Sequence, residues 1–198
     1  MTEMELREKI RRYEPFNEQE REDKKEILRQ MEQADHILTR DNRNAHITVS
    51  AWIMDRDRKK VLMAYHNLYQ SWAWLGGHAD GDADLKAVAL KEIREESGLE
   101  SIRFVTEDIF SLEILTVDGH EKRGSYVPSH LHLNVTYLLE ADPELPLRIK
   151  EDENSEIGWI GVEEIQRRST EKWFVERIYS KLCKKAQSLR NGKLAIPE

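Results

Sequence analysis

Apolar and polar side chains alternate along two stretches of the chain, 46–53 and 130–139, and this period of two predicts β-strands. In the second stretch His130, His132 and Asn134 share one polar face. Shorter apolar runs predict further strands at 61–65, 102–105, 110–117 and 157–160, and an aromatic segment at 72–75 leads directly into the glycine pair. The polar segment 118–128, with two glycines and a proline, is expected to form a flexible loop.

The first 40 residues are rich in charge and helix formers, and their apolar residues recur at helical spacing. Asn17, followed by Glu20 three residues later, matches a capping box at the start of a second helix. Strands dominate the sequence that follows. We therefore predict an N-terminal helical extension over 1–40, packed on the following domain or on a second subunit of a homodimer.

Two helices are predicted near the C-terminus. A short one should cover 162–167, and a longer one, capped by Ser169 or Thr170, should continue to about Leu189 with Trp173 toward the core. Mixed strands with one helix between them and another at the end indicate an α/β sandwich, a partly antiparallel sheet between helices.

The helix between the strands carries the strongest chemical signal. Asp82 is its expected N-cap, and Gly98 supplies the residue that ends it. The carboxylates of Glu92, Glu95 and Glu96 fall within a sector of roughly 100° and prolong an apolar stripe. Like charges on a partly buried face repel one another and lose hydration. A divalent cation such as Mg²⁺, or the basic residues of a solvated helix end, would compensate them.

The spacing of these residues resembles the Nudix box, G-x5-E-x7-R-E-U-x-E-E-x-G-U, where U is aliphatic. The positions that match are Gly77, Glu92, Ile93, Glu95, Glu96, Gly98 and Leu99. Ala83 stands where the family has its first Glu, and Lys91 stands where it has Arg. The resemblance implies a Nudix α/β/α sandwich with a mixed sheet, here over 41–190. The terminal segment 191–198 is expected to be a loose tail. It also implies metal-dependent hydrolysis of a pyrophosphate bond in a nucleoside diphosphate linked to another moiety.

The resemblance also implies roles for individual residues. Glu92, Glu95 and Glu96 are the predicted metal ligands, the carbonyl of Gly77 adds another, and Mg²⁺ is the expected cofactor with Mn²⁺ as an alternative. Glu95 is also a candidate catalytic residue, because a box glutamate can instead position the attacking water.

The water between metal and phosphorus needs a proton acceptor, which in relatives is a box glutamate or a carboxylate on a loop across the sheet. Glu153, in the acidic loop before Trp159, is our choice of general base, with Glu156 second. The alternative is a solvated acidic turn.

Four residues are predicted to contact the substrate. His78 directly follows the glycines and could bind a phosphate, and Trp74 could stack on a base. An ordinary loop role for His78 and a core position for Trp74 are the alternatives. His130 and His132 could contact the substrate, form a structural hydrogen-bonded pair, or bind a transition metal, for which no third soft ligand is evident.

Two other functions stay open. A degenerate Nudix domain would bind a nucleotide as a sensor without turnover, and Ala83 favours it. An isomerase acting on an allylic diphosphate would need a cysteine in the pocket, and Cys183 on the last predicted helix is poorly placed for this. The residues of the box would contact only the diphosphate and its metal, so they do not identify which nucleoside diphosphate derivative is the substrate.

The amino-acid composition restricts the kinds of molecule that this protein is expected to bind. The net charge is −7 with 35% charged residues, which argues against binding of nucleic-acid polymers or anionic membranes. No apolar run approaches the length of a membrane span, and the first residues lack the apolar core of a signal peptide. A single cysteine excludes an internal disulfide. We expect a cytoplasmic protein whose partner is a small-molecule nucleoside diphosphate derivative.

Overall fold

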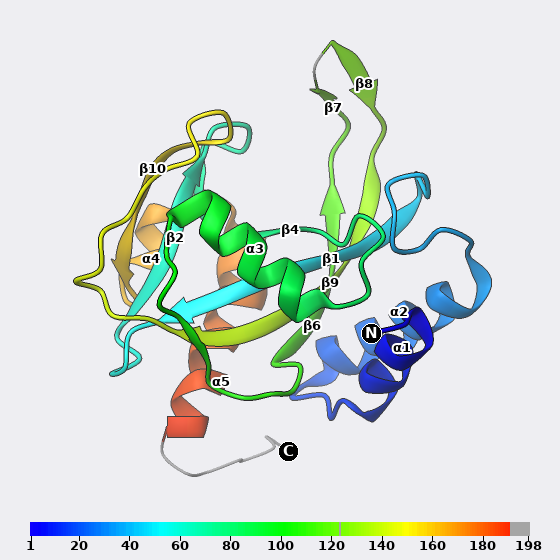
Figure 1. The fold of residues 1–198 in the computed structure, drawn as a ribbon, viewed down its shortest axis with the longest axis horizontal. Coiled ribbons are helices and arrows are strands. Elements are labelled where there is room, and N and C mark those ends of the chain that lie inside the picture. The colour runs from blue at the N-terminus through cyan, green and yellow to red at the C-terminus, as the bar shows by residue number, and fades with distance from the viewer. Residues whose placement is uncertain (123, 191–198) are drawn as a thin grey trace.

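The computed structural model describes residues 1–122 and 124–190, so the predicted tail 191–198 lies outside the described residues (Figure 1). The helices are α1 (Glu3–Arg12), α2 (Glu18–Gln33), α3 (Leu85–Ser97), α4 (Ile165–Arg168), the π-helical η1 (Phe174–Tyr179) and α5 (Ser180–Arg190). The strands are β1 (Ala45–Met54), β2 (Lys60–His66), β3 (Ser71–Ala73), β4 (Leu75–His78), β5 (Arg103–Phe104), β6 (Ser111–Val117), β7 (His120–Lys122), β8 (Ser125–Val127), β9 (His130–Glu140) and β10 (Asn154–Gly161).

Eight of the described strands form one mixed sheet. Its central order is β10-β2-β1-β9-β5, and β3, β4 and β6 pair with β2, β1 and β9 respectively. β1 and β9 run parallel with Ile47 opposite Leu133, whereas β4 runs antiparallel to β1 with Gly77 opposite Val49. The long alternating stretches therefore form the two central strands, as their period predicted.

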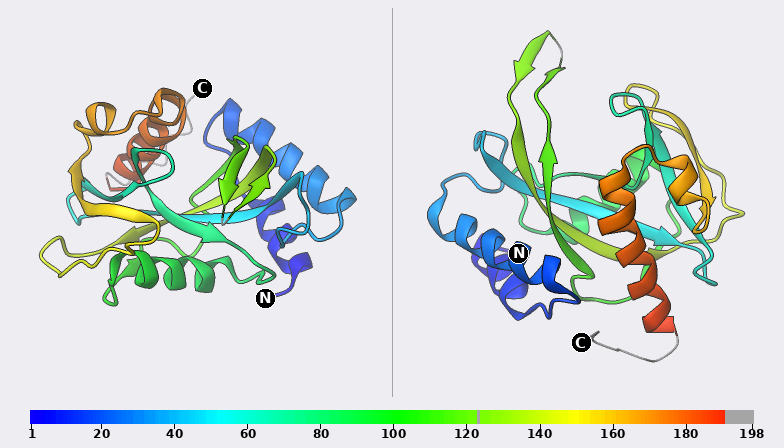
Figure 2. Two further views of the ribbon diagram at one scale, coloured as in Figure 1. Left: turned by 90° about the horizontal axis from the view of Figure 1, so that it is seen from above. Right: turned by 180° about the vertical axis from the view of Figure 1, so that it is seen from behind.

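Helices cover both faces of this sheet, which confirms the predicted α/β sandwich. In Figure 2 α3 lies on one face, and α4, η1 and α5 lie on the other. Ile47 and Val49 of β1 belong to the core beneath α3, while Trp52, from the opposite face of the same strand, packs with Tyr179. Each such fully buried side chain contributes about 1.5–3 kcal/mol to folding.

The N-terminal helices pack on the same domain. Leu6 and Ile10 of α1 and Ile27 of α2 are fully buried in the core that also contains Ile47. Asn17 caps α2, because its Oδ1 accepts a hydrogen bond from the Glu20 backbone N–H at 2.9 Å. The predicted capping box is otherwise wrong, since the Glu20 side chain turns inward instead of back to Asn17.

Glu20 belongs to a buried polar network that joins α2, β6 and α5. Lys181 Nζ lies 3.2 Å from Glu20 Oε1 and 2.9 Å from Glu113 Oε1, and both glutamates are fully buried. Lys185 Nζ lies 3.4 Å from Glu20 Oε2. Burial alone would raise the pKa of Glu20, but the charges of Lys181 and Lys185, together with hydrogen bonds from Ser111 and Tyr13, hold the pKa below its ordinary value. The network fixes the N-terminal helices to the last helix through charge as well as packing.

Two predictions near the box helix are wrong. The segment 118–128 contains a hairpin of β7 and β8 that projects from the sheet (Figure 1), with Gly124 at a φ of 77°. Its strands pair through backbone groups, which a polar sequence does not prevent. Asp84 is the N-cap of α3, since its Oδ1 accepts from Ala87 N at 3.3 Å. Asp82 Oδ1 instead accepts from Asp84 N at 2.8 Å.

Three predictions near the C-terminus also need correction. The short helix α4 begins at Ile165 rather than at 162. Ser169 ends α4 and bonds Ser71 instead of capping the last helix, and Thr170 donates its backbone N–H to Ser71 Oγ at 3.0 Å. Trp173 is 49% exposed rather than in the core, and the π-helical η1 that follows it buries Val175, Ile178 and Tyr179 instead. Within the described ranges, no helix combines the length and apolarity that crossing a membrane would require.

Candidate active site

Two adjacent glycines bring the strand β4 against the carboxylates of α3. Glu96 Oε1 accepts a hydrogen bond from the Gly76 backbone N–H at 3.0 Å. A Cβ atom added to Gly77 would lie 2.5 Å from the Glu92 carboxyl carbon, so the Gly77 backbone and this carboxylate are in close contact. The absence of a side chain at Gly77 therefore lets Glu92 approach the strand backbone, whereas the absence of one at Gly76 makes room for the neighbouring strand β1.

Nearby positive charge only partly compensates this group of carboxylates. Lys91 and Lys150 act to lower the pKa of Glu92, and Lys150 acts to lower that of Glu96, but burial outweighs them. Burial raises the pKa of Glu96 to about 8, and the charges of Glu92 and Glu153 add to this effect, while the Gly76 N–H opposes it. Burial and then the charge of Glu95 raise the pKa of Glu92. Asn154 Nδ2 donates to Glu96 Oε2 at 3.5 Å, but Asn154 Oδ1 is buried without a hydrogen-bond partner among the described residues. A divalent cation with oxygen ligands fits this arrangement, because it would supply the missing charge.

The predicted metal ligands differ in their surroundings. Glu92 and Glu96 are the buried or half-buried pair against Gly77, whereas the Glu95 side chain is 44% exposed with Oε1 3.8 Å from Lys91 Nζ. Lys91, at the Arg position of the box, is itself 66% exposed, and its ion pair among the described residues is with the exposed Glu95. Metal binding by these residues stays a prediction.

Glu153 faces the same carboxylates from the loop before β10. Its charge acts on the pKa of both Glu92 and Glu96, after burial as the main cause, and Lys150 Nζ donates to Glu153 Oε2 at 3.0 Å. Glu156 is exposed on β10, opposite Tyr65. The sequence did not single out Lys150 or Asn154, although both flank Glu153, because only the pairing of β10 with β2 turns this loop toward α3.

Replacing Gly77 with alanine should reduce metal affinity while leaving the fold intact. The new methyl group would meet only the end of the Glu92 side chain, which can rotate away and would then leave the site. Gly76→Ala is the contrasting variant, because its Cβ would lie 2.2 Å from the Val49 carbonyl oxygen of the neighbouring strand and should lower the melting temperature. Thermal unfolding with and without Mg²⁺ separates the two. Equal Mg²⁺ stabilisation of Gly77→Ala and the parent would contradict contact between Glu92 and the metal.

The predicted substrate-contact residues lie on the face of the sheet opposite α3. Trp74 packs in an aromatic cluster, 6.4 Å from Trp52 and 5.5 Å from Tyr179 between ring centroids. His132 gathers with other histidines, 4.9 Å from His78 between ring centroids, and burial lowers its pKa to about 2, with the charges of His78 and His46 adding to this. Contact between any of these residues and a substrate stays a prediction.

Ala83 and Cys183 bear on the alternative functions. Ala83 is 5% exposed and packs in the apolar core, so a glutamate at this position would place a carboxylate among aliphatic side chains. Cys183 lies on α5 beside the aromatic cluster, and burial raises the pKa of its thiol to about 12. A thiol of this kind stays protonated near neutral pH, which disfavours the isomerase.

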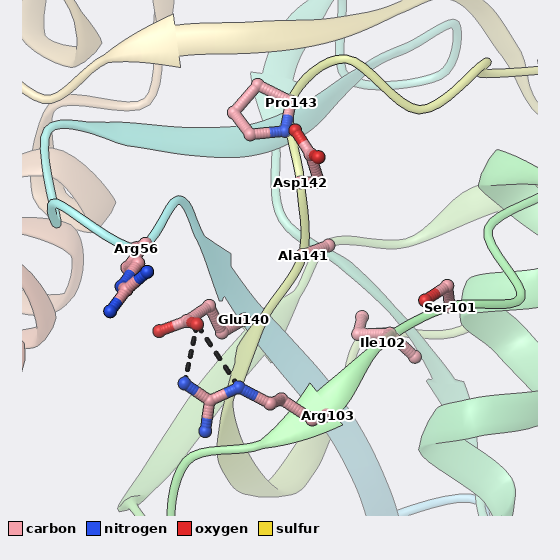
Figure 3. Close-up of a pocket in the computed structure, with 8 residues that line it drawn as sticks. All are labelled: Arg56, Ser101, Ile102, Arg103, Glu140, Ala141, Asp142 and Pro143. Carbon is pink, nitrogen blue, oxygen red and sulfur yellow. Dashed lines mark hydrogen bonds and ion pairs between the residues drawn. The ribbon is translucent and has the colours of Figure 1, made fainter.

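A separate open pocket lies at the C-terminal end of β9, away from His130 and His132. Figure 3 shows Glu140 facing Arg103, with Oε1 accepting from the guanidinium at 2.6 and 3.1 Å, and Arg58 lies 2.9 Å from Oε2. Two guanidinium groups therefore occupy the Glu140 carboxylate, and the described residues lining the pocket include no carboxylate of the box. The candidate active site is therefore the carboxylate cluster beside Gly76 and Gly77, and not this pocket.

The mixed sheet covered by helices on both faces makes this an α/β protein. The carboxylate cluster beside the two glycines is a site suited to a divalent metal ion. The family model of the NUDIX domain matches residues 44–182, and the chain belongs to the Nudix family. Three solved structures share the fold at low identity. An Ap4A hydrolase binary complex from C. elegans is 16% identical with a TM-score of 0.53, covering 74% of this chain and 98% of that chain.

A MutT protein from Methanosarcina mazei Go1 is 17% identical with a TM-score of 0.52, covering 74% of this chain and 98% of that chain. The NUDIX domain of Shewanella oneidensis NrtR, complexed with ADP ribose, is 15% identical with a TM-score of 0.51, covering 82% of this chain and 97% of that chain. At these identities the likeness shows the fold alone. A comparison with curated proteins found no match.

Proposed function

We propose that this protein is a metal-dependent pyrophosphohydrolase that cleaves a pyrophosphate bond in a nucleoside diphosphate linked to another moiety. The observation that supports it best is the pair Glu92 and Glu96 held against Gly77 and Gly76, whose pKa values stay raised although Lys150 acts to lower both. Relatives of the same fold include an Ap4A hydrolase and a domain complexed with ADP ribose, which supports a nucleotide-derived substrate.

In this proposal Glu92, Glu95, Glu96 and the Gly77 carbonyl hold Mg²⁺ or Mn²⁺. When bound, the metal polarises phosphoryl oxygens and lowers the pKa of water. Gly76 orients Glu96 through its N–H, and Asn154 offers the second carboxylate oxygen a further donor. Glu153 accepts the proton of the attacking water on its carboxylate, and Lys150 holds that carboxylate in place.

A panel of nucleotide substrates, assayed with Mg²⁺ and Mn²⁺ and followed by mass identification of products, tests the proposal. We expect metal-dependent release of two phosphate-containing products from at least one pyrophosphate-linked nucleotide. Nucleotide binding without turnover would instead support the sensor function, which the buried Ala83 at the first Glu position of the box favours. A homodimer and a cytoplasmic location remain predictions.

The general base is tested by comparing Glu153→Gln with Glu156→Gln at saturating metal. Glu153→Gln should lower kcat by on the order of 100-fold and flatten the rise of rate with pH on the acidic limb. Glu156→Gln, at the second candidate, should lose little kcat, because Glu156 is exposed on β10. Metal affinity should change little in either variant. Small and equal losses of kcat would assign the base to the box helix.

A further inference from the structure

Five of the seven histidines of the chain gather at one end of the sheet. The parallel pairing of β1 and β9 places His46 opposite His132, and His130 lies two residues earlier on the same face of β9. The ring of His46 is 5.0 Å from that of His130 and 5.1 Å from that of His132 between centroids. Ligand nitrogens of these three residues all lie within 4.8 Å of one another.

Backbone carbonyls orient two of the three rings. His46 Nδ1 lies 3.1 Å from the Asn42 carbonyl oxygen, and His130 Nδ1 lies 2.9 Å from the Pro128 carbonyl oxygen. A carbonyl only accepts, so Nδ1 carries the proton in both rings and Nε2 presents a lone pair. Histidine ligands of metals are held by their second nitrogen in this way.

One of the remaining nitrogens has no hydrogen-bond partner among the described residues, and the other two lie within hydrogen-bonding distance of each other. His46 is 4% exposed, and its Nε2 is buried without a hydrogen-bond partner among the described residues. His130 Nε2 and His132 Nε2 lie 3.2 Å apart. Two Zn–N bonds of about 2.0–2.1 Å at a tetrahedral angle would separate their nitrogens by about 3.3 Å. The spacing therefore matches two ligands of one tetrahedral ion.

We propose that His46, His130 and His132 form a zinc site on the face of the sheet opposite the box helix. Imidazole ligands suit Zn²⁺, whereas Mg²⁺ prefers oxygen, so this site differs in chemistry from the carboxylate site. Ile47 and Leu133 lie in the core beneath α3, and the alternation of β1 and β9 turns the histidines away from that helix. Three imidazoles leave a fourth position open for water or for an oxygen of a phosphate ligand.

The histidine site also lies close to the box along the chain. His78, the residue after Gly77, has its ring 5.1 Å from His46 and 4.9 Å from His132 between centroids. A zinc ion here would sit beside the loop that carries the predicted magnesium ligand. The proposal does not depend on hydrolysis, because metal binding can be measured without any substrate.

The test is a calorimetric titration of tag-free, chelator-treated protein with Zn²⁺ in the presence of excess Mg²⁺. We expect one Zn²⁺ per chain in the parent, and affinity lower by about 100-fold or more in His130→Gln and in His132→Gln. His36→Gln is the matched control, because His36 is exposed and lies outside the cluster. Its affinity should equal that of the parent. Glu95→Gln should also retain Zn²⁺.

Absorption of Co²⁺ bound to the parent gives a second readout that needs no variant. Tetrahedral Co²⁺ with imidazole ligands absorbs visible light strongly, whereas an octahedral oxygen site absorbs weakly. A weak spectrum, absence of Zn²⁺ binding in the parent, or unchanged binding in both folded histidine variants would overturn the proposal. Loss of Zn²⁺ in Glu95→Gln with retention in the histidine variants would also overturn it, by assigning the ion to the box. Circular dichroism establishes whether each variant is folded.

Discussion

Replacing Glu96 with glutamine is expected to lower kcat by on the order of 100-fold or more without loss of the fold. The amide oxygen of glutamine can still accept the Gly76 N–H, so the contact between α3 and β4 is retained. The charge that would bind a cation is lost. Because burial and the charge of Glu92 already disfavour the ionised carboxyl, the metal-free variant should melt no lower than the parent.

Thermal unfolding with added Mg²⁺ provides the second readout for this variant. The parent should gain stability from Mg²⁺, and Glu96→Gln should gain much less. Glu100→Gln is the matched control, since Glu100 is exposed just beyond the same helix. Turnover of Glu96→Gln within a few-fold of the parent, on an identified substrate, would show that Glu96 is not a metal ligand.

Replacing Lys181 with methionine should destabilise the protein by about 3–5 kcal/mol and lower its melting temperature by about 10 °C. Lys181 is 4% exposed and lies between two fully buried glutamates, Glu20 and Glu113. Removing the cation leaves Glu113 and Glu20 as buried carboxylates with their closest opposite charge gone. The measurement is reversible denaturant or thermal unfolding.

Lys184→Met is the control for this change, because Lys184 is an exposed residue of the same helix and should shift the melting temperature little. Adding Glu113→Gln to Lys181→Met should recover part of the stability, since one unpaired charge is then removed. A loss below about 1 kcal/mol in Lys181→Met would mean that the buried network does not join α2 and α5 energetically.

The sequence predicts those features of this fold that depend on local periodicity. Alternation along 46–53 and 130–139 identifies the two central strands. Of the three glutamates expected on one helix face, Glu92 and Glu96 lie against the glycines, whereas Glu95 is 44% exposed. The β7–β8 hairpin was missed because its pairing uses backbone groups that polar residues share with loops. Asp82 and Asp84 are both acceptable caps from sequence, and only the turn geometry decides between them.

Contacts between distant segments were not accessible from local patterns. Lys181 and Glu20 are far apart in the chain and meet only because α2 and α5 both pack on the sheet around β6. His46 was not recognised as a partner of His130 and His132, because their proximity requires the parallel register of β1 and β9. Lys150 and Asn154 look like ordinary loop residues in the sequence, because only the pairing of β10 with β2 brings them near Glu96.

The central claim, metal-dependent pyrophosphate hydrolysis at the carboxylate site, is tested most directly by running the reaction in water labelled with a heavy oxygen isotope. Each substrate of the panel is incubated with and without Mg²⁺, and the mass of each product is determined by mass spectrometry. The account predicts that one labelled oxygen enters one of the two phosphate-containing products, only when a divalent metal is present. Binding of the same nucleotides with no labelled product in Mg²⁺ or Mn²⁺ would contradict it.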